Sequence, residues 1–446
     1  MRIASRAFAT VALLASLLMP AAEAQSTASP PGSVRGVFGA DGPPSPARTT
    51  QQVSTWLDLG GGYDQSVSAA DSPGAGDGDG YAVTALGGFR YWRGRSTRSF
   101  EAGARLFRND QRSGRTTATG GEVNLNTTLE FGRRTGIALA LRAANEAAVL
   151  FGAFGPEFVD PPPADVAIVA PDVSPQQGDL RARWFSLGAN ATALRGWSAR
   201  HRTAVQYAQV RRRPTDDEGV DSDQRIVNVH HDWMVRMNAG ILANYRFEQV
   251  RQTFPQATLS EPIRTQSAEA GLRFERRLSP IRRASLSFQA GATQILSSDT
   301  PLVGIEGAIE PTGSLNASYT LTRRWLLLAG ATRSITVLQG VSQVPFTNAL
   351  GSLSVTGVVA RRVTVAVSGS FSQGSAVGPG PGDFDAVGGT ASIRYGFRYG
   401  GLFAGYTRYE HRLRQVSLAP GSIAPRFDQS SVRMGLTLWL PLYGAF

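Results

Sequence analysis

The residue types that carry most enzyme chemistry are scarce in this sequence of 446 residues. There is no cysteine, which excludes a thiol nucleophile, a thiolate metal site and a disulfide framework. His230 and Asp232 are two positions apart, which is about 7 Å along an extended strand and too long for a direct hydrogen bond. No serine is marked as a nucleophile by a neighbouring base. We therefore predict no enzyme activity and no catalytic residue.

One acidic run is the candidate for a metal site. Residues 77–80 read Asp-Gly-Asp-Gly, with Asp71 upstream. Carboxylate oxygens are typical calcium ligands, but the run lacks the remaining ligand spacing and the bidentate glutamate of an EF-hand loop. We therefore expect an acidic loop here, with no metal and no cofactor.

Charged side chains recur in alternation with apolar ones, so they share one face of an extended chain. Glu101 and Arg105 lie four positions apart on such a face, which is too far for contact along one strand, and ion pairs across strands are expected instead. The residues of this polar face that we single out are Arg90, Arg105, Arg142, Arg236, Arg246, Arg273, Arg394, Arg433, Asp58, Glu101, Asp232, Glu248 and Glu269.

The elements that position these charges are predicted to be β-strands. After residue 50, segments of about ten residues alternate apolar with small or polar residues, as membrane-spanning strands do. The alternation is clear at residues 53–63, 227–237 and 363–371, and it is weaker, with ambiguous phase, at 181–193 and 203–210. Counting the segments predicts an all-β fold with about 18 strands, 16 being the nearest other even number of about this size.

The connections between these segments alternate between short and long. Short, arginine-bearing turns are predicted at residues 93–98, 133–136, 195–201, 238–240, 276–283, 323–324, 361–362 and 399–401. Long loops rich in Gly, Pro, Asp and Ser are predicted at residues 64–80, 109–116, 146–179, 211–223, 251–264, 297–312, 339–345, 373–385 and 415–427. Short turns at one end and long loops at the other are typical of transmembrane antiparallel β-barrels, with periplasmic turns and extracellular loops.

The last stretch, residues 432–446, alternates most strictly, and the chain stops on Phe446. A strand that ends on a terminal aromatic residue resembles the closing strand of bacterial outer-membrane β-barrel proteins. The resemblance implies an outer-membrane barrel whose C-terminus is recognised by the barrel assembly machinery. Pro441 and Gly444 depart from the family pattern. The residues that the resemblance assigns to the assembly signal are Leu438, Leu440, Leu442 and Phe446.

A soluble β-sandwich or propeller is the competing fold. Three features argue against it. Several apolar faces end in Tyr, Phe or Trp, as expected for aromatic girdles at membrane interfaces. The opposite faces hold too many charged residues for a packed core, and no repeat of about 40 residues is present.

The region before the barrel divides into two parts. Residues 1–24 are predicted to be a secretory signal peptide, with Arg2 and Arg6 before an apolar core and Ala22-Glu23-Ala24 as the cleavage site. Residues 25–50 are rich in Ser, Pro, Gly and Ala and are expected to form a flexible periplasmic leader, either without a role or serving as a tether or partial plug. The barrel then occupies residues 51–446.

If the apolar face meets lipid, the charged face lines the lumen, and two interpretations follow. In the first, the arginines form a charged constriction that favours anions. In the second, they are neutralised by ion pairs that stabilise the wall. A barrel of about 16 to 18 strands is too wide for its own side chains to fill. The longest loop could narrow it, or pack at the cell surface instead, through Phe151, Phe154 and Phe158.

These features predict a channel that passes a hydrophilic solute or a polysaccharide across the outer membrane of a Gram-negative bacterium. Its likeness in layout to general porins and to exopolysaccharide-export barrels does not choose between the two substrates. The alternative is a structural or surface-binding barrel with a closed lumen and functional extracellular loops. The expected partners are outer-membrane lipid, the barrel assembly machinery and the solute. The formal net charge of +11 comes from scattered arginines without a dense basic run, so nucleic acid is not expected as a partner.

Overall fold

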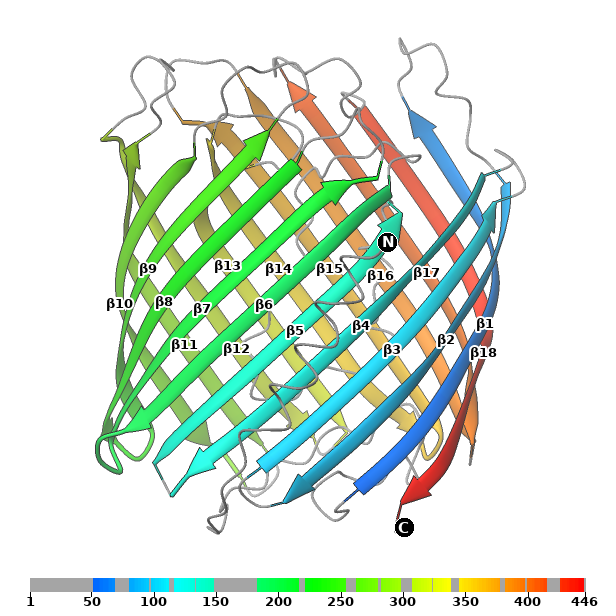
Figure 1. Ribbon diagram of the computed structural model, residues 1–446, viewed down its shortest axis with the longest axis horizontal. Helices are drawn as coiled ribbons and strands as arrows, with labels where there is room; N and C mark the ends of the chain where they lie inside the picture. The colour runs from blue at the N-terminus through cyan, green and yellow to red at the C-terminus, as the bar shows by residue number, and fades with distance from the viewer. Residues whose placement is uncertain are drawn as a thin grey trace, which may run out of the picture.

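Eighteen antiparallel strands form one closed sheet in the computed structural model (Figure 1). The structure describes residues 51–68, 80–95, 98–111, 116–132, 134–147, 183–215, 221–253, 262–279, 282–297, 307–322, 324–337, 345–377, 382–397, 399–414 and 426–444. The strands are β1 (Gln51–Ser68), β2 (Gly80–Arg95), β3 (Arg98–Gln111), β4 (Thr116–Phe131), β5 (Thr135–Ala147), β6 (Arg183–Gly196), β7 (His201–Pro214), β8 (Asp221–Arg236), β9 (Ala239–Thr253), β10 (Ile263–Arg277), β11 (Arg283–Ser297), β12 (Ile309–Thr322), β13 (Trp325–Val337), β14 (Pro345–Ala360), β15 (Val363–Ala376), β16 (Asp383–Phe397), β17 (Gly400–Arg414) and β18 (Arg426–Gly444).

Each strand pairs with its neighbours along the chain, and β1 pairs with β18 to close the barrel. The closing register runs from Gln52 opposite Gly444 to Ser68 opposite Phe427. Because closure pairs both edges of every strand, the backbone groups that an open sheet would expose are satisfied within the wall. The predicted fold, an antiparallel barrel of 18 strands, is therefore confirmed.

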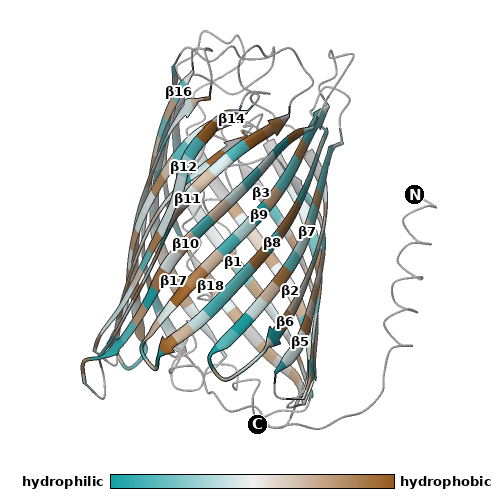
Figure 2. Cartoon of the chain, turned by 90° about the vertical axis from the view of Figure 1, so that its left-hand side faces the viewer, coloured by the Kyte–Doolittle hydropathy of each residue, from teal (hydrophilic) through white to brown (hydrophobic). Residues whose placement is uncertain are grey.

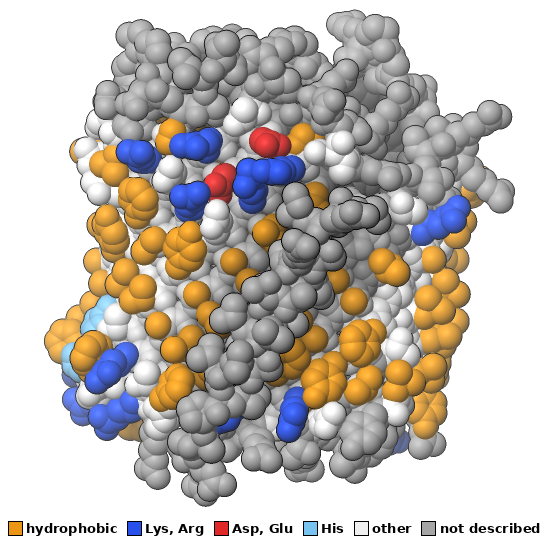
Figure 3. Space-filling model, in the orientation of Figure 1, with side chains coloured by type: hydrophobic (Ala, Val, Ile, Leu, Met, Phe, Trp, Pro, Cys, Tyr) orange, Lys and Arg blue, Asp and Glu red, His pale blue; other side chains and the backbone are white. Residues whose placement is uncertain are grey.

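The two faces of the wall differ as the sequence alternation predicted. Large apolar side chains lie exposed on the outside, for example Leu106 at 72% and Leu442 at 63% exposure. Hydrophobic and hydrophilic positions interleave along the strands in Figure 2, and Figure 3 shows hydrophobic side chains spread across the middle of the outer face in view. An apolar outer surface of this extent needs an apolar surrounding, which a lipid bilayer supplies.

The closing strand has the predicted phase over its described residues. Val432, Met434 and Leu440 are exposed on the outer face, whereas Arg433 alternates with them on the inner face. Pro441 lies at an irregularity, where the register with β1 shifts between Val53 and Ser54. Proline has no N–H to donate to the ladder, which accounts for an interruption at this position.

The strands run further than predicted at the end of the barrel that carries the long loops. The predicted loops at 211–223 and 251–264 are partly wrong, because β7 continues to Pro214, β8 begins at Asp221 and β9 continues to Thr253. The apolar alternation ends before the strands do. Backbone pairing continues beyond it through polar residues, which extend these strands above the apolar belt. At the other end the connections are short, and Arg361 and Arg362 alone join β14 to β15.

Several predictions fall outside the described residues. They are the signal peptide and leader (1–50), the acidic run with Asp71, the aromatic residues Phe151, Phe154 and Phe158, and the terminal Phe446. None of the described residues belongs to a helix long and apolar enough to cross a bilayer.

Candidate functional site on the inward face of the barrel

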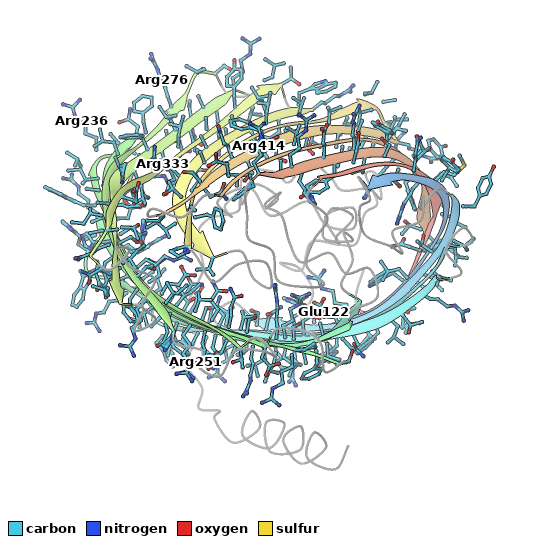
Figure 4. The ribbon with its side chains drawn as sticks, turned by 90° about the horizontal axis from the view of Figure 1, so that it is seen from above. Glu122, Arg236, Arg251, Arg276, Arg333 and Arg414 are labelled. Atoms are coloured by element: carbon cyan, nitrogen blue, oxygen red, sulfur yellow. The ribbon has the colours of Figure 1, made fainter. Side chains whose placement is uncertain are left out.

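The inward face consists of the residues that alternate with the exposed apolar ones, and its charges occur in pairs. Glu122 on β4 points into the ring in Figure 4. Oε2 of Glu122 is 3.0 Å from Nη2 of Arg142 on the neighbouring strand β5. The two strands place these residues on the same face two positions out of register, because Asn124 is the residue opposite Arg142. This pair is a cross-strand ion pair of the kind expected from the sequence.

A second cross-strand pair lies on β2 and β3. Arg90 uses both its Nε, 2.9 Å from Oε1 of Glu101, and its Nη2, which donates to Oε2 of Glu101 at 3.1 Å. A guanidinium that meets a carboxylate through two nitrogens has a fixed orientation as well as a neutralised charge. Arg90 is therefore held against the wall.

Two more arginines are paired on strands β8 to β10. Arg246 lies 2.7 Å from Oε2 of Glu248, whose other oxygen accepts a 2.6 Å hydrogen bond from Gln224. Arg273 approaches Asp232 at 3.7 Å across two strands. Arg90, Arg142, Arg246 and Arg273 thus each have an inward carboxylate as partner.

The remaining predicted residues are more scattered. Asp58 is opposite Thr437 across the closing seam, Glu269 is opposite Asn244, and Nε of Arg433 donates to Ser431 at 3.3 Å. Arg394 belongs to the inward face of β16, opposite Thr364. The side chain of Arg105 is outside the described part, although its backbone is opposite Glu122.

Arg236 departs from the inward face. The register of β8 against β9 shifts between Met234 and Arg236, and Figure 4 shows the Arg236 side chain on the outside of the ring. The irregularity lies beside the turn at Met237 and Asn238, where the alternation that we extended along the strand no longer applies.

One arc of the wall, made by β11 to β15, carries hydroxyl and amide groups where the other arcs carry charges. Ser285 and Ser318 are 2.6 Å apart across β11 and β12, and Ser372 donates to Asn348 at 2.7 Å. Between the two ends of these strands, the described inward residues are uncharged. We call this surface the hydroxyl wall. Its inward Ser and Asn residues include Ser285, Ser287, Ser314, Asn316, Ser318, Asn348, Ser352, Ser354, Ser368, Ser370 and Ser372, of which Asn348, Ser370 and Ser372 are buried.

The charged residues of the polar face did not predict the hydroxyl wall, because its residues carry no charge. A signal was present in the printed sequence, since serine recurs at every second position from Ser368 to Ser372. Polar but uncharged residues at alternate positions distinguish this arc from the ion-paired arcs.

Aromatic residues also occupy inward positions near the long-loop end. Phe346 and Phe384 are each 1% exposed, and their ring centroids are 5.7 Å apart. Tyr409 and His411 make a similar contact at 5.6 Å on β17. The sequence analysis placed Phe384 in the loop predicted at 373–385 and assigned no face to Phe346, so this packing was missed.

The histidines do not assemble a catalytic arrangement in the described part. His231 shares a 2.9 Å hydrogen bond with the hydroxyl of Thr203 on the outer face, where His201 stacks on Trp233. No group of three or more potential metal ligands occurs among the described residues.

Comparisons with known proteins found solved structures of low similarity and no match to the sequence itself. No family model and no curated protein matches the sequence. Among solved structures, OccK5 (OpdH) of Pseudomonas aeruginosa has a TM-score of 0.45 and 11% identity, over 88% of this chain and 98% of that chain. OccAB3 of Acinetobacter baumannii has a TM-score of 0.44 and 9% identity, over 87% and 99%. The siderophore receptor PirA of Pseudomonas aeruginosa has a TM-score of 0.43 and 9% identity, over 88% and 81%.

The location follows from the barrel itself. A closed wall of 18 antiparallel strands with an apolar outer belt is the architecture of proteins that span an outer membrane with strands. The chain is therefore an outer-membrane β-barrel, and what it does there must be argued from its own side chains.

Proposed function

We propose that the barrel is a channel that passes hydrophilic solutes across the outer membrane, and that its preferred solutes are uncharged and rich in hydroxyl groups. The observation that carries the proposal is the contrast within the inward face, where four arginines are ion-paired and the hydroxyl wall is uncharged. Barrels of about 16 to 18 strands are too wide for their own side chains to fill and leave an aqueous passage.

The ion pairs favour the neutralised wall over the charged constriction. A ring of fixed charge selects ions only if that charge is not already balanced. Arg90, Arg142 and Arg246 each lie within 3.1 Å of a carboxylate oxygen, so their fields are largely cancelled at a distance. We therefore expect weak selection between anions and cations.

The hydroxyl wall favours carbohydrate as the solute class. Serine and asparagine side chains both donate and accept hydrogen bonds, which matches the hydroxyl groups of a sugar. Weak hydrogen bonds that exchange with water allow passage without tight binding. A polysaccharide would make the same contacts repeatedly along the wall, and we include it among the proposed substrates.

Two measurements on the reconstituted full-length protein test the proposal. In planar bilayers we expect steady conductance with a reversal potential close to zero in a salt gradient. In liposomes we expect faster swelling with a neutral trisaccharide than with a charged solute of equal size. Bilayers that stay silent, with the circular dichroism of an intact barrel, would instead support the structural or surface-binding alternative.

A variant of the hydroxyl wall separates the substrate class from conduction itself. Replacing the partly exposed Ser352, Ser354 and Ser368 by Ala removes hydroxyls while keeping the wall uncharged. We expect slower uptake of the trisaccharide and an unchanged ion conductance. If both rates stay as in the wild type, the carbohydrate preference is wrong while the channel proposal stands.

A further inference from the structure

Arginines gather on the outer surface of the barrel at the long-loop end of β7 to β10. Figure 3 shows basic side chains, with acidic ones among them, above the hydrophobic side chains over the upper ends of these strands. All five arginines of the group are exposed. We call it the arginine patch, and it consists of Arg211, Arg213, Arg225, Arg251 and Arg264.

The strand registers bring these side chains close together. Asp223 on β8 is opposite both Arg211 on β7 and Arg251 on β9. Gln249 on β9 is opposite both Arg225 on β8 and Arg264 on β10. Diagonal neighbours of this kind are about 7 to 8 Å apart on one face of a sheet. The patch is therefore one continuous surface across four strands.

The carboxylates of the patch do not balance its arginines. Asp223 lies 3.1 Å from Arg225 and also accepts a 3.2 Å hydrogen bond from Gln209, and Asp221 lies 4.0 Å from Arg213. Arg211, Arg251 and Arg264 have no carboxylate within ion-pair distance among the residues that the structure describes. Among the described residues of the patch, five arginines face two aspartates, which is an excess of three positive charges.

The patch lies next to the apolar belt, and this position determines which parts of a lipid can contact it. Directly below the charged rows, Tyr207, Val227 and Phe247 lie side by side on the outer face of β7, β8 and β9. Tyrosine and phenylalanine at the end of an apolar band mark the interface between acyl chains and headgroups. The arginines of the patch lie one to three outward-facing positions further along these strands, at headgroup level with acyl chains beneath them.

On another arc of the same rim, the exposed arginines are balanced by carboxylates. On the outer face of β16 to β18, Arg408 lies 3.2 Å from Asp428, Arg412 lies 2.6 Å from Glu410, and Arg414 lies 3.1 Å from Asp385. We call this group the paired arc. Each of its three arginines has its own carboxylate, unlike Arg211, Arg251 and Arg264.

We propose that the arginine patch binds the phosphate groups of a phosphorylated glycolipid in the outer leaflet. A guanidinium presents two N–H groups in a plane, which matches two oxygens of a phosphate. A lipid supplies phosphate at headgroup level and acyl chains against the belt at the same time, whereas a soluble anion supplies only the phosphate. The proposal goes beyond the channel function, and it holds whether or not the barrel conducts.

Native mass spectrometry of the full-length protein in a neutral detergent tests the proposal, with bisphosphorylated lipid A as the probe. We expect the wild type to retain lipid A. Each arginine near an anionic lipid surface contributes to the binding free energy. We therefore expect that replacing Arg211, Arg251 and Arg264 by Gln lowers the apparent affinity on the order of 100-fold. Arg264→Gln alone, a milder change, is expected to lower it about fivefold.

The paired arc provides the matched control. Replacing Arg408, Arg412 and Arg414 by Gln changes the same number of arginines at the same rim, and we expect an affinity within about twofold of the wild type, because salt screens charges over about 10 Å. Circular dichroism confirms that each variant keeps its barrel. Dephosphorylated lipid A should bind no better to the wild type than to the patch variant.

Four results would overturn the proposal. They are equal lipid A affinity in the wild type and the patch variant, an equal loss in the control variant, equal binding of dephosphorylated lipid A, and displacement of lipid A by inorganic phosphate. A dimer that disappears only in the patch variant would assign the surface to a contact between copies of this chain instead.

Discussion

At the scale of single residues, the inward arginines Arg90, Arg142, Arg246 and Arg273 are members of ion pairs rather than free charges. Arg90 and Glu101 are partly exposed, with 42% and 26% of their side-chain surface accessible, so solvent screens their attraction. What matters for the channel is therefore the charge that remains when one partner is removed.

The first prediction concerns this pair. Arg90→Ser should shift the reversal potential toward cation preference, because Glu101 is then unbalanced, and should lower stability by about 1 kcal/mol. Reversal potentials in a salt gradient and melting temperatures measure the two effects. The double variant Arg90→Ser with Glu101→Ser should return the reversal potential to the wild-type value. A cation preference that persists in the double variant would mean that Glu101 is not its source.

The second prediction concerns two neighbours on β18 that face opposite ways. Leu438→Arg should destabilise the barrel by about 2–4 kcal/mol, because the charge would lie against the acyl chains. Thr437→Arg should be mild, because Thr437 is on the inward face opposite Asp58. Denaturant unfolding in lipid vesicles compares the two, and equal losses would contradict the assigned faces.

At the scale of elements, glycines let aromatic rings lie flat against the wall. The ring of Phe371 on β15 covers Gly351 on β14, and the ring of Trp325 on β13 covers Gly357. A Cβ at either glycine would collide with the ring. Such aromatic–glycine pairs hold the register of adjacent strands.

The third prediction follows from this packing. Gly351→Ala should cost about 1–3 kcal/mol, because the Phe371 ring must leave its position or the strands must separate. Gly369→Ala is the control on β15, since its added Cβ would meet its nearest atom at an ordinary 3.8 Å. We expect the control to be neutral or slightly stabilising. Similar losses in both variants would mean that the ring contact contributes little.

The number of strands, and which residues face outward, could be predicted from the sequence. Successive side chains of a strand point to opposite faces, so a wall with lipid on one side gives apolar residues at every second position. Strand ends at the long-loop rim could not, since Arg211 and Arg251 lie beyond the apolar stretch but still within the backbone ladder. Partners across strands could not be predicted either. Arg142 meets Glu122 through a register that only the folded sheet defines.

The predicted site shows the same division. Most of its charged residues share the inward face, because alternation alone places them there. Arg236 does not, because a local register shift ends the alternation. Inward Phe346 and Phe384 were missed, because a single-face pattern cannot reveal that two rings meet across strands.

At the scale of the whole molecule, one end carries short turns and the other long connections. Barrels of this type have their short turns in the periplasm, and we expect the same sidedness here. Exposed residues at the two ends, Thr215 after β7 and Arg361 after β14, can report on it.

The fourth prediction uses the absence of cysteine from the chain. In whole cells, Thr215→Cys should react with a membrane-impermeant maleimide, whereas Arg361→Cys should react only after the outer membrane is broken. Both should react in detergent, which controls for local reactivity. Labelling of Arg361→Cys alone in intact cells would reverse the assigned orientation.

The seam between β1 and β18 has a consequence for how the barrel forms. Every other pairing joins strands adjacent in the chain, but the seam joins Gln52 to Gly444. Contacts between residues so far apart in sequence are slow to form, because the chain entropy of a long closure must be overcome before any of its hydrogen bonds is gained. The hairpins can therefore assemble early and in sequence, while one edge of β1 stays unpaired until β18, the last strand, has arrived. During that interval the protein is a curved open sheet, and its two free edges are the places where it is most exposed to pairing with the wrong chain.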